Sequence, residues 1–129
     1  MAHPNEELIR AGLKAFGSGD VESMRQFFAP DVVWHVPGRS QFSGDYKGQD
    51  ETLGLFARLF EFTGGTFRLD VHDVLANDEH GVVLSIATAE RGGKRLSSKS
   101  VQILHIQGGK ATESWLHPED QYASDDFFG

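Results

Sequence analysis

Two polar residues lie where a predicted strand should present only apolar side chains. In the segment that begins at Phe67, apolar residues alternate with polar ones through Leu69 and Val71. The next position on that apolar face is Asp73, and His72 precedes it. A carboxyl group removed from water has a raised pKa and can serve as a general acid or base. We therefore expect Asp73 and His72 to be candidate catalytic residues, unless the strand ends there and Asp73 meets water or caps the turn.

A second group of polar side chains shares a face with apolar ones in residues 96–107. Ser98, Ser100 and Gln102 alternate there with outward residues and are followed by Leu104. Hydroxyl and amide groups on an apolar wall can orient a ligand carbonyl or hydroxyl by hydrogen bonds. We expect Gln102 to be a polar ligand contact and Leu104 to be part of the wall.

The two remaining strands of this half are less informative. In residues 82–91 the larger apolar side chains predict the inner face, which would run Val82, Leu84, Ile86, Thr88 and Glu90. In residues 110–117 both faces are mixed, so the pattern does not assign the inner one. Trp115 is a candidate ligand contact, and Glu113 is either an acid–base residue or one half of an ion pair on the outer face.

Helical spacing and strand alternation place these residues in an α+β order. Residues 5–16, a short segment after Asp20, and a segment after Asp50 show the apolar spacing of helices. Residues 32–36 form a strand, residues 39–48 a loop, and four strands joined by glycine-containing turns follow from Thr66 onward. The tail, residues 119–129, either docks on the body or on a partner subunit, or frays.

Composition restricts the classes of function. The 129 residues are 39% apolar and 24% charged, which suits a single globular domain over residues 1–129. A formal net charge of −7 opposes binding to nucleic acid. The chain has no cysteine, which fits a reducing cytoplasm, and its N-terminal segment has no signal-peptide or membrane-spanning pattern. We expect a cytoplasmic protein that binds neither nucleic acid nor membranes.

Five short sequence motifs occur in the same order as in a known protein family. They are Gly-Asp at 19–20, Phe-Ala-Pro-Asp-Val-Val-Trp-His-Val-Pro-Gly at 28–38, Tyr-Lys-Gly at 46–48, Val-His-Asp-Val-Leu-Ala at 71–76, and Gly-Lys-Ala-Thr-Glu-Ser-Trp at 109–115. Over residues 5–128 the chain resembles the SnoaL-like, ketosteroid isomerase-related branch of the nuclear transport factor 2-like superfamily. The resemblance implies a cone-shaped α+β roll, in which three N-terminal helices pack on a strongly curved, mainly antiparallel sheet around an apolar cavity. It also implies a homodimer formed through the convex side of the sheet. Functions in the superfamily range from isomerases, cyclases and dehydratases to noncatalytic binding modules, so the fold does not decide the function.

The ketosteroid isomerase machinery is not carried over. Ketosteroid isomerase can be aligned with this chain on residues 19–20, on residues 28–37 and on the last Gly-Lys strand. In that alignment its oxyanion-hole tyrosine falls at Gly12, its general-base aspartate at Val36, and its protonated aspartic acid at Gln102. A base and an oxyanion donor are the minimum for enolisation, so that chemistry is not expected from these positions.

The same alignment implies which side chains line the cavity. Trp34 and Val36 point into the cavity, and His35 lies between them in the sequence. His35 is either a base at the mouth of the cavity or, as strand alternation favours, a residue on the opposite face of the sheet. Phe56 and Phe60 of the third helix complete the predicted wall. We expect a pocket for a small hydrophobic molecule, with acid–base chemistry on a carbonyl compound or noncatalytic binding as the alternatives. The six histidines are scattered, so neither a metal site nor a cofactor is expected.

Overall fold

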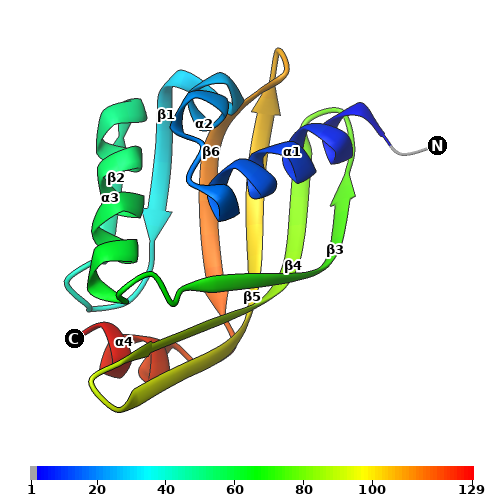
Figure 1. The fold of residues 1–129 in the computed structure, drawn as a ribbon. Helices are drawn as coiled ribbons and strands as arrows, with labels where there is room; N and C mark the ends of the chain where they lie inside the picture. Colours follow the sequence, from blue (N-terminus) through cyan, green and yellow to red (C-terminus); the bar gives the residue numbers. More distant parts are fainter. Residues whose placement is uncertain (1–2) are drawn as a thin grey trace.

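The computed structural model describes residues 3–129 and has an α+β fold (Figure 1). The helices are α1 (Pro4–Ser18), α2 (Val21–Phe27), α3 (Gly48–Phe62) and α4 (Gln121–Phe128). The strands are β1 (Phe28–Val36), β2 (Gly44–Lys47), β3 (Arg68–Ala76), β4 (His80–Arg91), β5 (Lys94–Gln107) and β6 (Lys110–Pro118). The predicted order of three helices and a β-meander is confirmed.

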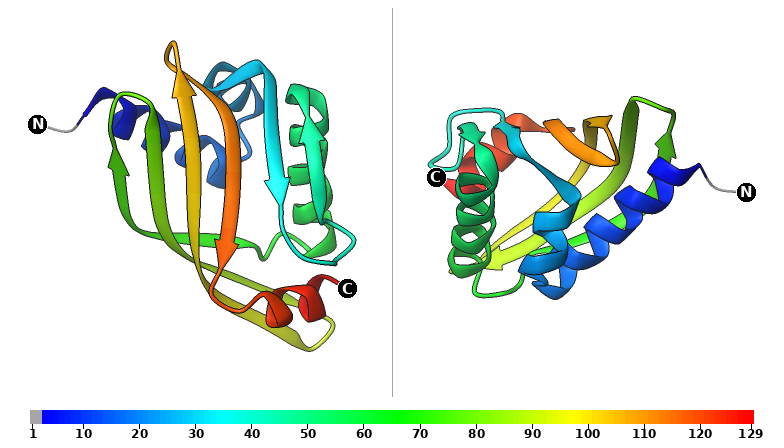
Figure 2. Two further views of the ribbon diagram at one scale, coloured as in Figure 1. Left: turned by 180° about the vertical axis from the view of Figure 1, so that it is seen from behind. Right: turned by 90° about the horizontal axis from the view of Figure 1, so that it is seen from above.

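All six strands form one strongly curved sheet in the order β2-β1-β6-β5-β4-β3. Strands β3 to β6 pair antiparallel as successive hairpins, and β1 joins β6 as the parallel pair. The helices α1, α2 and α3 lie against the concave side, and the convex side is left uncovered by helices (Figure 2). This arrangement is the cone-shaped roll that the family resemblance implies.

Helix α1 crosses the concave face because a glycine lets it approach. Its Ile9 is buried against the sheet, and a Cβ atom at Gly81 of β4 would collide with the Ile9 side chain. The helix ends at Gly19, whose φ of 70° is the left-handed conformation of a helix C-terminus. Asp20 then caps α2 by accepting a hydrogen bond from the Ser23 amide at 3.2 Å.

Two segments differ from the sequence-based expectation. The predicted loop 39–48 contains β2, which pairs antiparallel with β1 through four residue pairs. Helix α3 begins at Gly48 and its N-cap residue is Lys47, so the expected cap at Asp50 is wrong. Strand β2 is short and polar, and its alternation is therefore too brief to recognise in the sequence.

The tail docks on the body of the same chain. Asp120 caps α4 by accepting a hydrogen bond from the Ala123 amide at 3.1 Å. Phe127 is buried with Ala89 and Leu96, and Phe128 packs edge-to-face on Phe42 with ring centroids 5.6 Å apart. Of the three alternatives for the tail, the structure shows docking within the chain.

Within residues 3–129, none of the helices has the length and the apolar composition needed to cross a bilayer.

If α4 is anchored by Phe127, truncating that side chain destabilises the protein. We expect Phe127→Ala to lower the free energy of unfolding in urea by about 3 kcal/mol, because a buried phenylalanine leaves a cavity when removed. The control is Tyr122→Ala on the same helix, whose side chain is 89% exposed and should change the free energy by less than about 0.5 kcal/mol. Equal effects of the two substitutions would show that α4 is not held by its apolar face.

Candidate functional site

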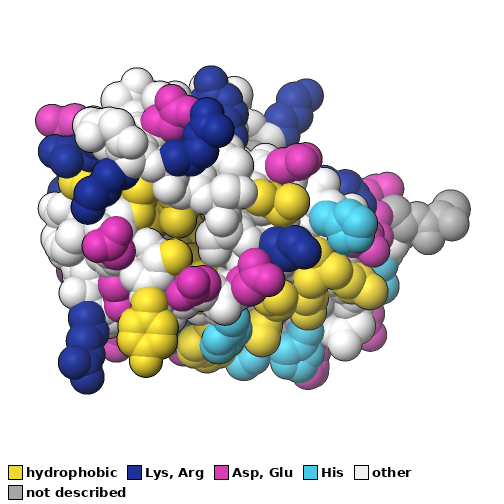
Figure 3. All heavy atoms as spheres, turned by 90° about the horizontal axis from the view of Figure 1, so that it is seen from below, with side chains coloured by type: hydrophobic (Ala, Val, Ile, Leu, Met, Phe, Trp, Pro, Cys, Tyr) yellow, Lys and Arg dark blue, Asp and Glu magenta, His cyan; other side chains and the backbone are white. Residues whose placement is uncertain are grey.

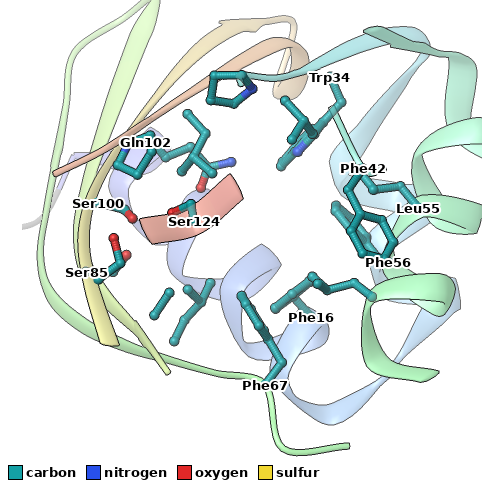
Figure 4. Close-up of a pocket in the computed structure, with 18 of the residues that line it drawn as sticks. Phe16, Trp34, Phe42, Leu55, Phe56, Phe67, Ser85, Ser100, Gln102 and Ser124 are labelled. Carbon is teal, nitrogen blue, oxygen red and sulfur yellow. The ribbon is translucent and has the colours of Figure 1, made fainter. Parts of the chain in front are cut away.

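A cavity of about 170 Å³ lies between the concave face of the sheet and the helices. Its walls come from every helix and from strands β1, β3, β4, β5 and β6 (Figure 4). Most of the lining side chains are apolar, and serine and glutamine side chains make up most of the polar remainder. A concave, mainly apolar lining with a few polar groups is typical of a small-molecule site.

Large aromatic rings form one wall of the cavity. Phe16 of α1 meets Phe56 of α3 edge-to-face at 5.0 Å between ring centroids. Phe56 meets Trp34 of β1 at 5.3 Å and 85°, and Trp34 meets Phe28 at 5.5 Å. These edge-to-face contacts are favourable and give the rings defined positions relative to one another.

A strip of polar side chains forms the facing wall. Ser85 of β4 and Ser100 of β5 are directly opposite each other in the sheet, and both face the cavity together with Ser98 and Gln102. Figure 4 shows Ser85, Ser100 and Gln102 across the cavity from Phe42 and Phe56. Within residues 3–129, the hydroxyls of Ser85 and Ser100 make no hydrogen bond to protein. They can therefore bond to a ligand.

Gln102 is held in place from behind. One end of its amide is hydrogen-bonded to the buried Ser114 of β6, with 2.9 Å between Nε2 and Oγ. The other end of the amide remains for a ligand. Such a fixed amide recognises a polar group without first losing side-chain freedom.

Helix α4 closes one end of the cavity with Gln121, Ser124, Asp125 and Phe128. The fit against the loop after β1 is tight, because Gly38 has a φ of 89° and a Cβ atom there would collide with Gln121 and Asp125. Figure 3 views the molecule from this end and shows a recess floored by hydrophobic side chains.

Five of the residues predicted as ligand contacts line this cavity: Trp34, Val36, Phe56, Gln102 and Leu104. The other two are placed elsewhere. Phe60 lies behind the wall, with its ring 5.1 Å from Phe16 and 6.2 Å from Phe67. Trp115 is on the convex face, where it stacks on His35 at 5.3 Å.

Asp73 and His72 do not face the cavity, which corrects their expected placement. A β-bulge between Val71 and Asp73 inserts one residue into β3, so that Val74 takes the inward position instead. The Asp73 side chain is 53% exposed and its carboxylate lies 3.9 Å from the Arg10 guanidinium. His72 is exposed. Strand alternation alone cannot reveal such a bulge.

His35 lies on the convex face between two carboxylates. Its Nε2 is 2.6 Å from Glu113 and its Nδ1 is 2.6 Å from Asp45. Hydrogen bonds to Glu113 first and to Asp45 second raise the pKa of His35 above its ordinary value of 6.5. Glu113 is thus in an ion pair on the outer face, and this cluster has no access to the cavity. Among the described residues, no set of three or more histidine or acidic side chains is arranged to hold a metal ion.

Several lining residues escaped the sequence analysis. Ser85 was missed because the inner face of β4 carries the small residues Gly81, Val83, Ser85, Ala87 and Ala89, and the larger apolar ones point outward. Asp125 and Ser124 were missed because they lie in a tail whose docking the sequence left open. The two adjacent phenylalanines at positions 127 and 128 were the sequence signal that this tail docks on the body.

The ion pairs of His35 predict a pH-dependent stability. Because the folded state holds the proton more tightly, this stabilisation is fully present below pH 6.5 and is lost as the pH rises through the raised pKa. We expect the free energy of unfolding of wild type to exceed that of His35→Gln most at about pH 6, with the difference shrinking toward about pH 9. Urea denaturation across this range measures it, with the exposed His117→Gln as control. A constant difference would contradict the paired arrangement.

Several known proteins are similar to this chain in sequence or in structure over nearly its whole length. The uncharacterized protein Rv0034 of Mycobacterium tuberculosis is 30% identical over 124 residues, which cover 95% of this chain and 94% of that protein. The structure of Bal32a, from a soil-derived mobile gene cassette, superposes with a TM-score of 0.95 at 36% identity and covers 99% of this chain and 98% of its own. A protein of unknown function with a cystatin-like fold from Xanthomonas campestris gives 0.89 at 28% identity, with coverage of 95% and 96%. The sequence model of the SnoaL-like domain matches residues 9–114. The chain therefore belongs to the SnoaL-like family within the nuclear transport factor 2-like fold.

Proposed function

We propose that the chain binds a small, neutral, mainly apolar molecule with oxygen functions in the cavity of the cone. The observation that carries this proposal is the two-sided lining, with the aromatic wall on one side and the Ser85–Ser100–Gln102 strip on the other. A flat ring system would bury its faces against the aromatic wall and turn its oxygen atoms toward the strip. The sidedness is what separates this site from an ordinary packing defect.

The volume limits the size of the ligand. A dry cavity of about 150 Å³ in another protein accommodates benzene. At about 170 Å³, the present cavity suits a molecule of one or two rings without rearrangement. Compounds such as indane, 1-indanone and 5-indanol are therefore suitable probes, because they share one carbon frame and differ in their oxygen function.

Noncatalytic binding is better supported than acid–base catalysis. The predicted histidine–carboxylate pair lies outside the cavity, and Asp125 is the one ionisable side chain among the described residues that line it. A second candidate function, proton transfer on a hydrophobic carbonyl compound, rests on that single carboxylate. We propose a cytoplasmic location for either function, since a chain without cysteine suits a reducing compartment.

We further propose that two copies associate through the convex face of the sheet. The convex-face patch consists of half-buried apolar side chains that point away from the cavity: Val82, Leu84, Ile86, Val101, Ile103 and Trp115. Figure 3 shows hydrophobic side chains gathered beside histidines at this side of the molecule. A contiguous apolar patch on a sheet is typical of an interface between subunits.

The polar strip predicts a selective loss of affinity. We expect Ser100→Ala to weaken the binding of 1-indanone by about 2- to 10-fold in isothermal titration calorimetry, because one net hydrogen bond is lost, and to leave indane unaffected. Ser97→Ala on the exposed face of the same strand is the matched control. Equal affinities of wild type and Ser100→Ala for 1-indanone would remove the strip from ligand recognition.

The convex-face patch predicts a change in oligomeric state. We expect wild type to elute with twice the chain mass of 14.2 kDa in size-exclusion chromatography with light scattering. Ile103→Glu should elute as a monomer, because the substitution buries a charge in each copy of the interface. Gln107→Glu, at the exposed end of the same strand, should remain dimeric. A monomeric wild type would contradict the proposed association through the convex-face patch.

A further inference from the structure

Among the described residues that line the cavity, Asp125 is the ionisable one. It belongs to α4, which contributes Gln121, Ser124 and Phe128 to the same end of the cavity. Its immediate neighbour Asp126 is exposed and lies 3.9 Å from Lys94. The helix therefore turns one of two adjacent acids toward the cavity and the other toward solvent.

The hydrogen bonds of Asp125 engage one of its two oxygen atoms. Its Oδ1 accepts from the Arg39 amide at 3.0 Å and from Nε2 of Gln121 at 3.0 Å. Among residues 3–129, no Lys, Arg or His side chain forms an ion pair with Asp125, and Oδ2 accepts no hydrogen bond from protein. The two N–H groups fix the carboxylate and leave an acceptor at the α4 end of the cavity.

A carboxylate in this position discriminates among ligands by their hydrogen-bonding role. It accepts a strong, charge-assisted hydrogen bond from a hydroxyl group. It gains nothing from an ether or a ketone, which cannot donate, and it repels an anionic ligand. An ammonium group would also bind a carboxylate, but it would add the desolvation cost of a second charge beside the apolar walls.

We propose that Asp125 is a ligand-recognition residue that selects a neutral ligand with a hydroxyl group at the α4 end of the cavity. This inference rests on the proposed ligand-binding function and adds the class of ligand, a one- or two-ring phenol, enol or alcohol. The hydroxyl group contacts Asp125 while the rings lie on the aromatic wall. A second oxygen function, where present, faces the strip that contains Gln102.

Calorimetric titration with matched probes tests the inference. For wild type we expect 5-indanol to bind about 10-fold or more tightly than 5-methoxyindane, which keeps the oxygen atom but cannot donate a hydrogen bond. Asp125→Asn keeps an oxygen acceptor for the Arg39 amide and removes the charge, so it should reduce the affinity for 5-indanol about 10-fold and leave that for 5-methoxyindane unchanged. Asp126→Asn, one residue away, should bind both probes as wild type does.

The outcomes separate this inference from the proposed function. If wild type binds 5-indanol and 5-methoxyindane with equal affinity, the selection by Asp125 is wrong and binding in the cavity stands. The same holds if Asp125→Asn and Asp126→Asn behave alike. Should none of the indane derivatives bind to wild type, both the pocket function and this inference would be overturned. Equal affinities of wild type for the two probes would overturn the inference without any variant, so the test keeps its force even where Asp125→Asn folds poorly.

Discussion

The site exists because small side chains on the concave face of the sheet lie opposite large aromatic side chains and do not fill the space between them. The inner faces of β4 and β5 carry Ser85, Ala87, Ser98 and Ser100, which are too small to reach the aromatic rings of the opposite wall. Close packing would normally eliminate such a space, since a void costs the contacts of the atoms that line it. The curvature of the sheet and the ring contacts of Phe56 hold the walls apart. The protein therefore keeps an apolar volume lined by hydroxyl groups.

The two faces of the sheet divide the chemistry of the molecule. The inner face is almost free of charge, with Asp125 reaching it from α4 and not from a strand. The outer face holds the paired His35, flanked by Glu113 and Asp45, beside the convex-face patch. His35 is thus separated from the ligand cavity, so the proposed binding in the cavity does not depend on the protonation of His35.

The order of elements followed from sequence periodicity, but the facing of individual strands did not. The alternation in β5 correctly placed Gln102 and Leu104 inward, because that face carries a continuous polar and apolar sequence signal. In β3 the bulge after Val71 reversed the expected face, and in β4 the larger apolar residues proved to point outward. Both errors concern which set of alternate residues in a strand faces the cavity. That choice depends on how the strand pairs with its neighbours and on what each face of the sheet packs against, and not on the strand's own sequence alone. The position of Asp125 depends on tertiary docking of α4, and local sequence patterns cannot supply it.

The central claim is that ligands occupy the space between the aromatic wall and the strip of serine and glutamine side chains. Isotope-filtered NMR on labelled protein with unlabelled 1-indanone detects which side chains lie next to the bound probe. We predict intermolecular nuclear Overhauser effects to Trp34, Phe56 and Leu104, which line the cavity. Effects confined to Ile103 and Trp115 of the convex face would contradict the account, because they would place the ligand outside the cone.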